Sequence, residues 1–358
     1  TALAGKEAER DRFVFFSGQV FALISQGISR PDIVHCHDWH TGVLVRALKR
    51  KFEIRNSKFE TPKLVFTIHN LVNQGKWGED NFMRDGITHA DMVTTVSPTY
   101  AKEILTKEYG EGLEGILRAR ARSKTLVGIL NGIDYAFWNP KRDAFLSAPL
   151  KDDIAAFKFA NKAALVRTLK LRSVEAPLVG IVARLTHQKG IDFVQGALRT
   201  IREEFGAQFV VLGQGEERFE SFLRDEAARH PERIAFHLGF DERLAHRIYA
   251  ASDFFLMPSR FEPSGLGQMI SMRYGTIPIV RRTGGLADSV IHHRTGFVFE
   301  DASPSAVEHA LREALTCYTS SPRTFEAMRA RVIKTDFSFD HAAKDYVQLY
   351  KKILARSR

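Results

Sequence analysis

The sequence predicts an α/β protein with two doubly wound domains, each built around a parallel sheet. Its length of 358 residues gives room for two domains with buried cores. Short apolar runs rich in β-branched residues alternate with helical patterns along most of the chain, which is the rhythm of βαβ units. This rhythm is interrupted once, by the polar stretch KRDAFLSAPLKDD that follows Asn139 and Pro140. We therefore expect a domain boundary in that stretch.

The first half of the chain contains four short runs typical of buried strands. They cover residues 32–36, 63–68, 92–96 and 125–130. Helical patterns separate them at residues 13–26, 41–51 and 98–108. Ser97 directly precedes Pro98, so we expect Ser97 to cap the third of these helices.

The second half repeats the pattern after a helix at residues 154–169. Strands are predicted at residues 178–182, 208–212, 234–238, 254–257, 277–280 and 296–299. Helices are predicted at residues 191–205, 219–229, 244–250, 265–274 and 304–317. A last helix at residues 340–355 carries apolar side chains at helical spacing and is expected to pack through them: Ala342, Ala343, Val347, Tyr350 and Ile353.

Composition excludes several classes of protein. Hydrophobic residues at 44% and charged residues at 26% are ordinary globular values, and no apolar run is long enough for a membrane helix. Only two cysteines occur, which suits a reducing compartment and argues against secretion. The net charge of +10 fits an anionic small molecule, a nucleic acid or an acidic surface. The basic stretches 46–55 and 118–124 lack interleaved aromatic residues, so we interpret them as solvated faces and expect no nucleic-acid partner.

Polar residues follow most of the predicted strands. They are residues 37–40, 69–70 and 131–134 in the first half, and 184–189, 213–215, 262–267 and 283–285 in the second. Ligands of open α/β sheets bind beyond the carboxyl ends of the strands. Two such crests of polar loops predict a ligand cleft between the two domains.

The second domain offers the features of a diphosphate site. Arg184 and Lys189 lie between a strand and a helix, where charge and helix dipole can hold phosphates, although a solvated basic turn would look the same. In residues 261–267 (FEPSGLG), Glu262 precedes a Gly-rich helix start; it could face a sugar or act as a helix cap. Residues 283–285 form a second Gly-rich turn, which permits close approach of a ligand or tight packing.

Histidines cluster at the strand ends of the first domain. His35 and His37 fall on one strand face and could share a zinc ion, but no third ligand converges on them, so a polar strand end that presents Asp38 or His40 to a sugar is favoured. His69 could contact a sugar or transfer a proton, or it could be a satisfied strand-end histidine.

Taken together and in order, seven segments of the chain resemble the ADP-glucose-using glycogen and starch synthases. The segments are PDIVHCHDWHTG, VFTIHNLVNQG, ADMVTTVSPTYAKEI, GILNGIDYAFWNP, VARLTHQKG, PSRFEPSGLGQM and YGTIPIVRRTGGLADSV. The resemblance implies a retaining glucosyltransferase of the GT-B fold, with two Rossmann-like domains facing a cleft. It implies an acceptor-side domain at residues 1–145, a donor-side domain at 146–338 and a final helix at 339–358 that crosses back to the first domain.

The resemblance also assigns roles to individual residues. Glu262, His69, Arg184 and Lys189 would be catalytic: the two cations hold the ADP diphosphate, and the other two meet the transferred glucose. Donor-binding residues would be Asp38, Asn131, Phe240, Ser264, Gly265, Leu266, Gly267, Thr283, Gly284 and Gly285, with Phe240 placed near adenine. The family requires no metal or other cofactor, and its acceptor is the non-reducing end of an α-1,4-glucan.

The chain departs from the family pattern at several places. Ser264 and Gly267 stand where the family usually has Cys and Thr or Asn, and the segment 75–90 is shorter than usual. No K-x-G-G-L loop precedes residues 37–40, so we expect an incomplete first domain with an unpaired sheet edge, and a chain that is a fragment of a longer protein.

Two alternatives to this function stay open from the sequence. One is a non-catalytic homologue that binds glucan or nucleotide and acts in regulation. The other is a related glycosyltransferase that uses UDP-glucose, because residues that hold a diphosphate do not read the base. The expected location is the cytoplasm of a bacterium or the plastid of a photosynthetic eukaryote, with no membrane partner.

Overall fold

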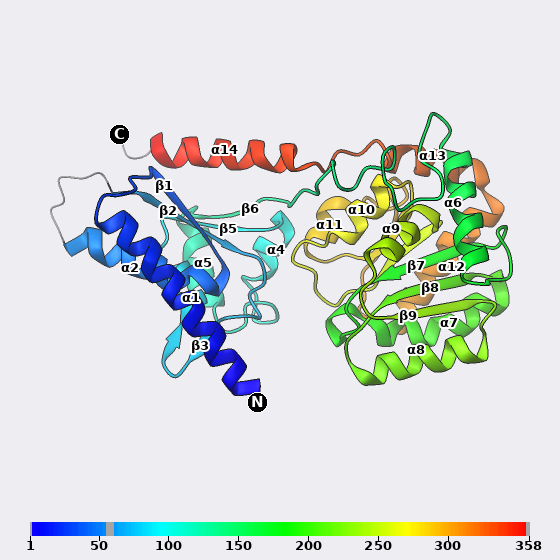
Figure 1. The fold of residues 1–358 in the computed structure, drawn as a ribbon, viewed down its shortest axis with the longest axis horizontal. Helices are drawn as coiled ribbons and strands as arrows, with labels where there is room; N and C mark the ends of the chain where they lie inside the picture. Colours follow the sequence, from blue (N-terminus) through cyan, green and yellow to red (C-terminus); the bar gives the residue numbers. More distant parts are fainter. Residues whose placement is uncertain (1, 55–60, 356–358) are drawn as a thin grey trace. The chain divides into compact units, whose positions relative to one another are not determined.

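The computed structural model describes residues 2–54 and 61–355, and it confirms an α/β protein with parallel sheets. The chain divides into two compact units (Figure 1). One unit combines Thr1–Asn131 with Asp340–Arg358, and the other is Gly132–Phe339. Within the described residues, no helix is both long and apolar enough to cross a lipid bilayer.

The first unit contains a four-stranded parallel sheet in the order β1-β2-β5-β6. Its strands are β1 (Ile33–His37), β2 (Lys63–Ile68), β5 (Met92–Thr95) and β6 (Leu126–Gly128). All four predicted strands are confirmed, with ends that differ by one or two residues. A small hairpin of β3 (Lys76–Trp77) and β4 (Asp80–Asn81) lies outside this sheet and was not predicted.

Five helices accompany this sheet within the described part of the chain before residue 131: α1 (Ala2–Ser25), α2 (Asp38–Ile54), α3 (Phe82–His89), α4 (Pro98–Glu103) and α5 (Glu114–Arg122). The Ser97 hydroxyl accepts a hydrogen bond from the Tyr100 amide at 3.2 Å, so the predicted cap of α4 is confirmed, although α4 ends five residues earlier than expected. Helix α3 escaped prediction because Gly86 lies within it. That glycine allows close packing, since a Cβ there would lie 2.3 Å from the Phe66 ring.

The two faces of this sheet are covered by different elements. Phe66 and its neighbours on one face pack against α2 and α3, whereas Val65 and Met92 on the other face contact the last helix, α14 (Phe339–Ala355). This division follows from the alternation of side chains along a strand. Figure 1 shows α14 (red) running along the sheet of this unit.

Helix α14 packs through a stripe that shares Ala342, Tyr350 and Ile353 with the predicted one but differs from it at two positions. Ala343 is exposed and Val347 is 48% exposed, so including them in the buried face was wrong. Tyr346, Leu349, Tyr350 and Ile353 pack against the sheet, and Ala342 is also buried. The true spacing of 4, 3, 1 and 3 also fits a helical face. The sequence offered two overlapping apolar stripes, and contact with Val65 and Met92 selects the one with the larger side chains.

The second unit contains a six-stranded parallel sheet in the order β12-β11-β10-β7-β8-β9. Its strands are β7 (Leu178–Val182), β8 (Gln208–Gly213), β9 (Ile234–Leu238), β10 (Phe254–Met257), β11 (Ile277–Arg281) and β12 (Phe297–Phe299). Every predicted strand is confirmed to within one residue. From β7 the chain adds β8 and β9 on one side of the sheet, and then β10, β11 and β12 on the other. Doubly wound sheets bind their ligands at such a reversal, here between β7 and β10.

Helices cover both faces of the second sheet (Figure 1). They are α6 (Ile154–Thr168), α7 (Ile191–Phe205), α8 (Glu217–Arg229), α9 (Glu242–Ala251), α10 (Gly267–Arg273), α11 (Gly284–Ser289), α12 (Pro304–Ser320) and α13 (Pro322–Val332). Val179 and Ile181 of β7 face the core formed with α7 and α12. Gly180 faces the opposite way, where a Cβ would lie 2.6 Å from Ile248 of α9.

The boundary between the two units falls after Asn131. The segment 132–145, which was expected in the first domain, therefore belongs to the second unit. Ile133 pairs with Ser338 in a short parallel bridge, and the Arg247 guanidinium donates to the Phe145 carbonyl at 3.0 Å. These contacts hold the segment to the second unit.

A buried charge network ties α6 and α13 to the second sheet. The Asp253 carboxylate accepts hydrogen bonds from Lys162 Nζ at 2.6 Å, from Arg329 Nη2 at 3.0 Å and from the Leu178 amide at 3.0 Å. Each of the three charged side chains is at most 6% exposed. Among the described residues, this carboxylate is therefore the ionic partner of Lys162, and it shares Arg329 with Glu326, whose carboxylate lies 2.6 Å from Arg329 Nη1.

We predict that Asp253→Ala destabilises the second unit by about 3–5 kcal/mol, because among the described residues it leaves buried Lys162 without an ionic partner and Arg329 paired only with the partly exposed Glu326. The measurement is urea unfolding read from amide exchange in β7 and β10. Arg199→Ala, which removes an exposed ion pair with Glu203, serves as the control and should leave the midpoint unchanged. Equal midpoints for the two variants would contradict the prediction.

Candidate active site

In the second unit, a lysine and a buried glutamate meet at the carboxyl end of the sheet. Lys189 ends the short 3-10 turn His187–Lys189 that follows β7, and its Nζ lies 2.5 Å from Glu262 Oε2. Glu262 is only 6% exposed, and the same oxygen accepts a hydrogen bond from Ser259 Oγ at 2.9 Å. The sequence predicted Lys189 and Glu262 as site residues. It did not predict that they pair with each other, nor the role of Ser259.

Glycines allow the loops around this pair to touch backbone to backbone. A Cβ on Gly284 would lie 1.9 Å from the Glu262 carbonyl oxygen, and one on Gly285 would lie 2.0 Å from the Ser264 carbonyl oxygen. The Gly285 amide donates to the Glu262 carbonyl at 3.1 Å. Thus the turn at residues 283–285, in which Thr283 is also buried, holds the Glu262 loop in place.

The hydroxyl of Ser264 is buried and has no hydrogen-bond partner among the residues that the structure describes. Buried polar atoms are nearly always paired, so an orphaned one beside a charged pair indicates a place for a ligand atom. Gly265 adopts a left-handed φ of +67°, and Leu266 beside it is 46% exposed. Gly267 begins α10 close to the Phe255 ring, which a Cβ would approach to 2.9 Å.

The other two predicted residues of this unit, Arg184 and Phe240, also follow strands, and their side chains are exposed. Arg184 follows β7 and its side chain is exposed. Phe240 follows β9 and is 84% exposed, so its ring face is open for stacking.

An arginine that sequence reasoning missed fixes the turn that carries Lys189. Arg260 makes a bidentate ion pair with Asp192 at 2.7 and 2.6 Å and donates to the His187 carbonyl at 2.8 Å. This hydrogen bonding lowers the pKa of the Asp192 carboxyl. Arg260 was only one of many arginines in the sequence, and nothing in its local pattern indicated this clamp.

In the first unit, Asp38 organises the loop that carries His69. Asp38 begins α2 with a left-handed φ of +54°, which is uncommon for a residue other than glycine. Its Oδ1 accepts hydrogen bonds from the His69 amide at 2.8 Å and the Asn70 amide at 3.5 Å. Burial raises the pKa of Asp38, and these two hydrogen bonds oppose that rise. Asn131 is half-buried in the loop that follows β6. Its backbone N–H donates a hydrogen bond to the Val96 carbonyl at 3.2 Å.

The histidines of this unit are hydrogen-bonded in a way that leaves no zinc site at His35. The Nδ1 of His35 lies 2.6 Å from the Tyr350 hydroxyl, and its Nε2 lies 2.6 Å from Thr67 Oγ1, so both ring nitrogens are occupied. His37 Nδ1 lies 3.0 Å from His69 Nε2. The zinc alternative for His35 and His37 is therefore not supported, because His35 has no free nitrogen to give to a metal.

Two tryptophans of the first unit line a cavity of about 350 Å³. Trp39 and Trp77 lie with ring centroids 5.1 Å apart, and Gly75, with φ +59°, permits the contact because a Cβ there would lie 2.7 Å from the Trp39 ring. The other lining residues are Glu9, Val72, Asn73, Gln74, Gly75 and Lys76. Aromatic faces beside amides and charges are suited to sugar rings, which have apolar faces and polar edges.

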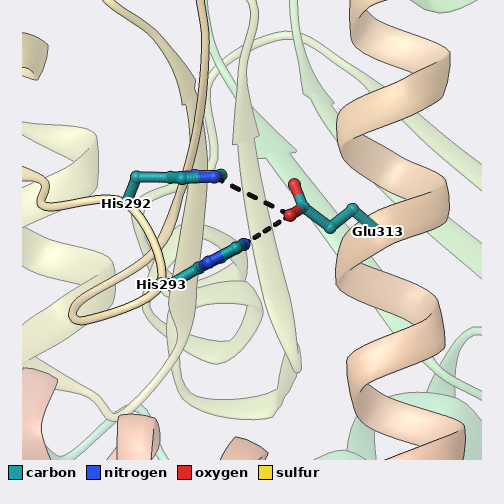
Figure 2. A group of neighbouring side chains, drawn as sticks. All are labelled: His292, His293 and Glu313. Carbon is teal, nitrogen blue, oxygen red and sulfur yellow. Dashed lines mark hydrogen bonds and ion pairs between the residues drawn. The ribbon is translucent and has the colours of Figure 1, made fainter.

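One group within the described residues has metal-ligand spacing: His292, His293 and Glu313 (Figure 2). Both histidines point their Nε2 atoms at the Glu313 carboxylate, and His293 makes the shorter contact. However, the Val298 amide donates to His292 Nδ1 at 3.0 Å, which places the proton of a neutral ring on Nε2. A metal at Nε2 would require the opposite tautomer, so we interpret the group as a hydrogen-bonded surface cluster.

Comparisons with known proteins identify the family of the chain. Residues 2–119 match the family profile of the starch synthase catalytic domain, and residues 169–334 match that of glycosyl transferases group 1. The glycogen synthase of Thermodesulfovibrio yellowstonii is 40% identical over 368 residues, which cover 96% of this chain and 73% of that protein. The chain belongs to the glycogen and starch synthase family. The glycogen synthase of Anoxybacillus flavithermus is likewise 40% identical, over 99% of this chain and 79% of its own length.

Solved structures extend the comparison to the fold. The catalytic domain of starch synthase IV from Arabidopsis thaliana, bound to ADP and acarbose, matches with a TM-score of 0.86 at 35% identity, covering 97% of this chain and 78% of that one. Sucrose-phosphate synthase from Thermosynechococcus elongatus matches with a TM-score of 0.63 at 19% identity, over 98% and 80% of the two chains, and shares the fold alone. The expected GT-B fold is confirmed, and this synthase-family chain is a glucosyltransferase.

We predict that the stability of the first unit of this synthase falls as the pH is lowered from about 7 to about 4. Burial, with smaller effects of His37 and His69, lowers the pKa of His35 from 6.5 to about 4. Between these values the unfolded chain binds the proton and the folded chain does not, so acid favours unfolding. His35→Gln should flatten this pH slope, as measured by urea unfolding followed through Trp39 and Trp77 in a Trp138→Phe background. An unchanged slope would contradict the assignment.

We further predict that Gly285→Ala lowers both activity and stability, because its Cβ would collide with the Ser264 backbone and push the Glu262 loop aside. The matched control is Gly196→Ala within α7, where a Cβ would meet Pro304 at 3.4 Å, an ordinary van der Waals contact. Alanine there should be neutral or slightly stabilising, since it reduces the freedom of the unfolded chain. Initial rates and melting temperatures of both variants provide the check, and a fully active Gly285→Ala would contradict it.

Proposed function

We propose that this glucosyltransferase moves glucose from ADP-glucose to the non-reducing end of an α-1,4-glucan, with retention of the anomeric configuration. The observation that carries the proposal is the contact between Lys189 and Glu262. A carboxylate alone would repel a diphosphate. With Lys189 at 2.5 Å its charge is balanced, and Glu262 can serve a sugar hydroxyl while the ammonium, which has three donors, also reaches a phosphate oxygen.

Other groups of the second unit complete a donor site. Arg184 is exposed beside the same strand end and adds a second permanent cation for the diphosphate. Gly265, Leu266 and Gly267 contribute backbone amides where α10 starts, and the orphaned Ser264 hydroxyl can receive or give one hydrogen bond. These groups would stabilise the negative charge that develops on the departing diphosphate.

The nucleoside would lie toward Phe240, whose open ring face can stack on a base. Stacking tolerates any base, so this contact favours a nucleotide without selecting adenine. The support for ADP-glucose comes from the relative that was solved with ADP bound, at 35% identity.

The first unit would contribute groups that meet the transferred glucose and the acceptor. His69 and Asn131 present polar atoms at strand ends, and Asp38 fixes the loop that carries His69. The cavity lined by Trp39 and Trp77 has the chemistry for a glucan ring. The same relative was solved with acarbose, an oligosaccharide, which supports a glucan acceptor.

The proposal is tested by incubating the 358-residue chain with ADP-glucose and a maltooligosaccharide, and measuring chain extension and ADP release. Lys189→Ala and Glu262→Ala should each lower kcat/KM at least about 100-fold, the usual effect of removing a charge-stabilising group. Arg199→Ala, on the exposed face of α7, is the matched control and should keep wild-type rates.

Three outcomes would change the assignment. Wild-type rates in the Lys189 and Glu262 variants would remove these residues from the site. A tenfold preference for UDP-glucose over ADP-glucose would replace the donor. Binding of ADP in calorimetry without any turnover would favour a binding or regulatory role over catalysis.

A further inference from the structure

We propose that His37 is a positioning residue for His69, and that Tyr350 on the last helix supports it through His35. This inference rests on the proposed function in one respect, the contact of His69 with the transferred glucose. The positioning itself is argued from contacts within the first unit.

The three histidines form a continuous array on one face of the sheet. His35 and His37 are two residues apart on β1, so their side chains point the same way, and their rings stack with centroids 4.3 Å apart and an angle of 29° between planes. His37 Nδ1 then lies 3.0 Å from His69 Nε2. The ring of His69 is thereby held at one of its two nitrogens.

The backbone of the loop that carries His69 is held by Asp38, the residue after His37. The Asp38 carboxylate accepts the His69 amide at 2.8 Å, and the Thr41 hydroxyl accepts the His37 amide at 2.7 Å. Two consecutive residues of the β1–α2 turn therefore fix both the main chain and the ring of His69.

The far end of the array is anchored on helix α14 and on two neighbouring strands. His35 bonds to the Tyr350 hydroxyl and to Thr67 Oγ1, each at 2.6 Å, and Thr67 Oγ1 lies 2.6 Å from Thr94 Oγ1. With both nitrogens engaged, the His35 ring cannot turn. It gives the His37 ring a fixed surface on which to stack.

Among the residues that the structure describes, only one ring nitrogen of His69 has a hydrogen-bond partner. Its Nε2 shares a proton with His37, so only Nδ1 remains to face a substrate. Burial lowers the pKa of both rings, and their mutual repulsion lowers that of His37 further, whereas Asp38 opposes this. Among the described residues, His35 and His40 also act on the pair electrostatically, and the lowered pKa values favour the neutral form of both rings at neutral pH.

The test compares two substitutions at residue 37 that separate the stack from the hydrogen bond. His37→Phe keeps a ring over His35 but offers no nitrogen to His69. His37→Asn places an amide group where Nδ1 was and loses the stack. We expect His37→Phe to lower kcat at least about tenfold with KM for the donor changed less than about twofold, and His37→Asn to retain at least about a third of wild-type kcat.

Two further readouts separate positioning from a structural role. In His37→Phe, the ¹⁵N chemical shifts of the His69 ring should change. In the same variant, the acidic limb of the pH profile of kcat/KM should move. Tyr350→Phe should lower kcat in the same direction by a smaller factor. Equal ADP affinity and equal circular dichroism in all variants would show that the second unit and the fold are intact.

Wild-type kcat and unchanged His69 ring signals in His37→Phe would overturn the inference. A large loss in both His37→Phe and His37→Asn, with no recovery by the amide, would also overturn it. If the unmodified chain transfers no glucose from ADP-glucose, the proposed function fails, yet the His69 ring signals still decide whether His37 holds that ring.

Discussion

The buried carboxylate of Glu262 is the constraint around which the second unit's site is built. An ionised carboxylate is costly to bury without a partner, and here it would also repel the phosphates of a donor. Lys189 removes both difficulties, but only if the loops after β7 and β10 approach to within one hydrogen bond. Ser259, and the Arg260 clamp onto the Lys189 turn, hold them at that distance.

Such close approach of loops demands positions without side chains. Gly284 and Gly285 permit the 283–285 turn to touch the backbone on either side of Pro263, and the Gly285 amide bonds to the Glu262 carbonyl. In the first unit, a loop is held by a side chain, that of Asp38, and not by close backbone contact. Its carboxylate bonds directly to the His69 loop, and its own backbone takes up the strain of a left-handed φ. Both units thus use a carboxylate at a strand end to organise a loop.

The predictable part of the fold lay in local patterns. Strands such as residues 178–182 were predicted to the residue, because buried parallel strands carry apolar runs that need no tertiary information. Helix α3 was missed because Gly86 lowers its propensity, and the value of that glycine becomes visible only against the Phe66 ring. For α14, periodicity allowed two faces, and only the partner sheet distinguishes Leu349 from Val347.

In the candidate site, too, the sequence predicted which residues take part. It did not predict which of them contact one another. Strand-end position identified Lys189, Glu262 and His69, but the contact between the first two spans 73 positions and depends on how two loops fold. The histidines show why. Spacing on β1 allowed a shared zinc ion, yet a histidine can ligate a metal only if one nitrogen is free, and Tyr350 and Thr67 occupy both nitrogens of His35. Whether such a motif binds a metal or orients a neighbour is therefore decided by the partners of its second nitrogens, which come from distant segments.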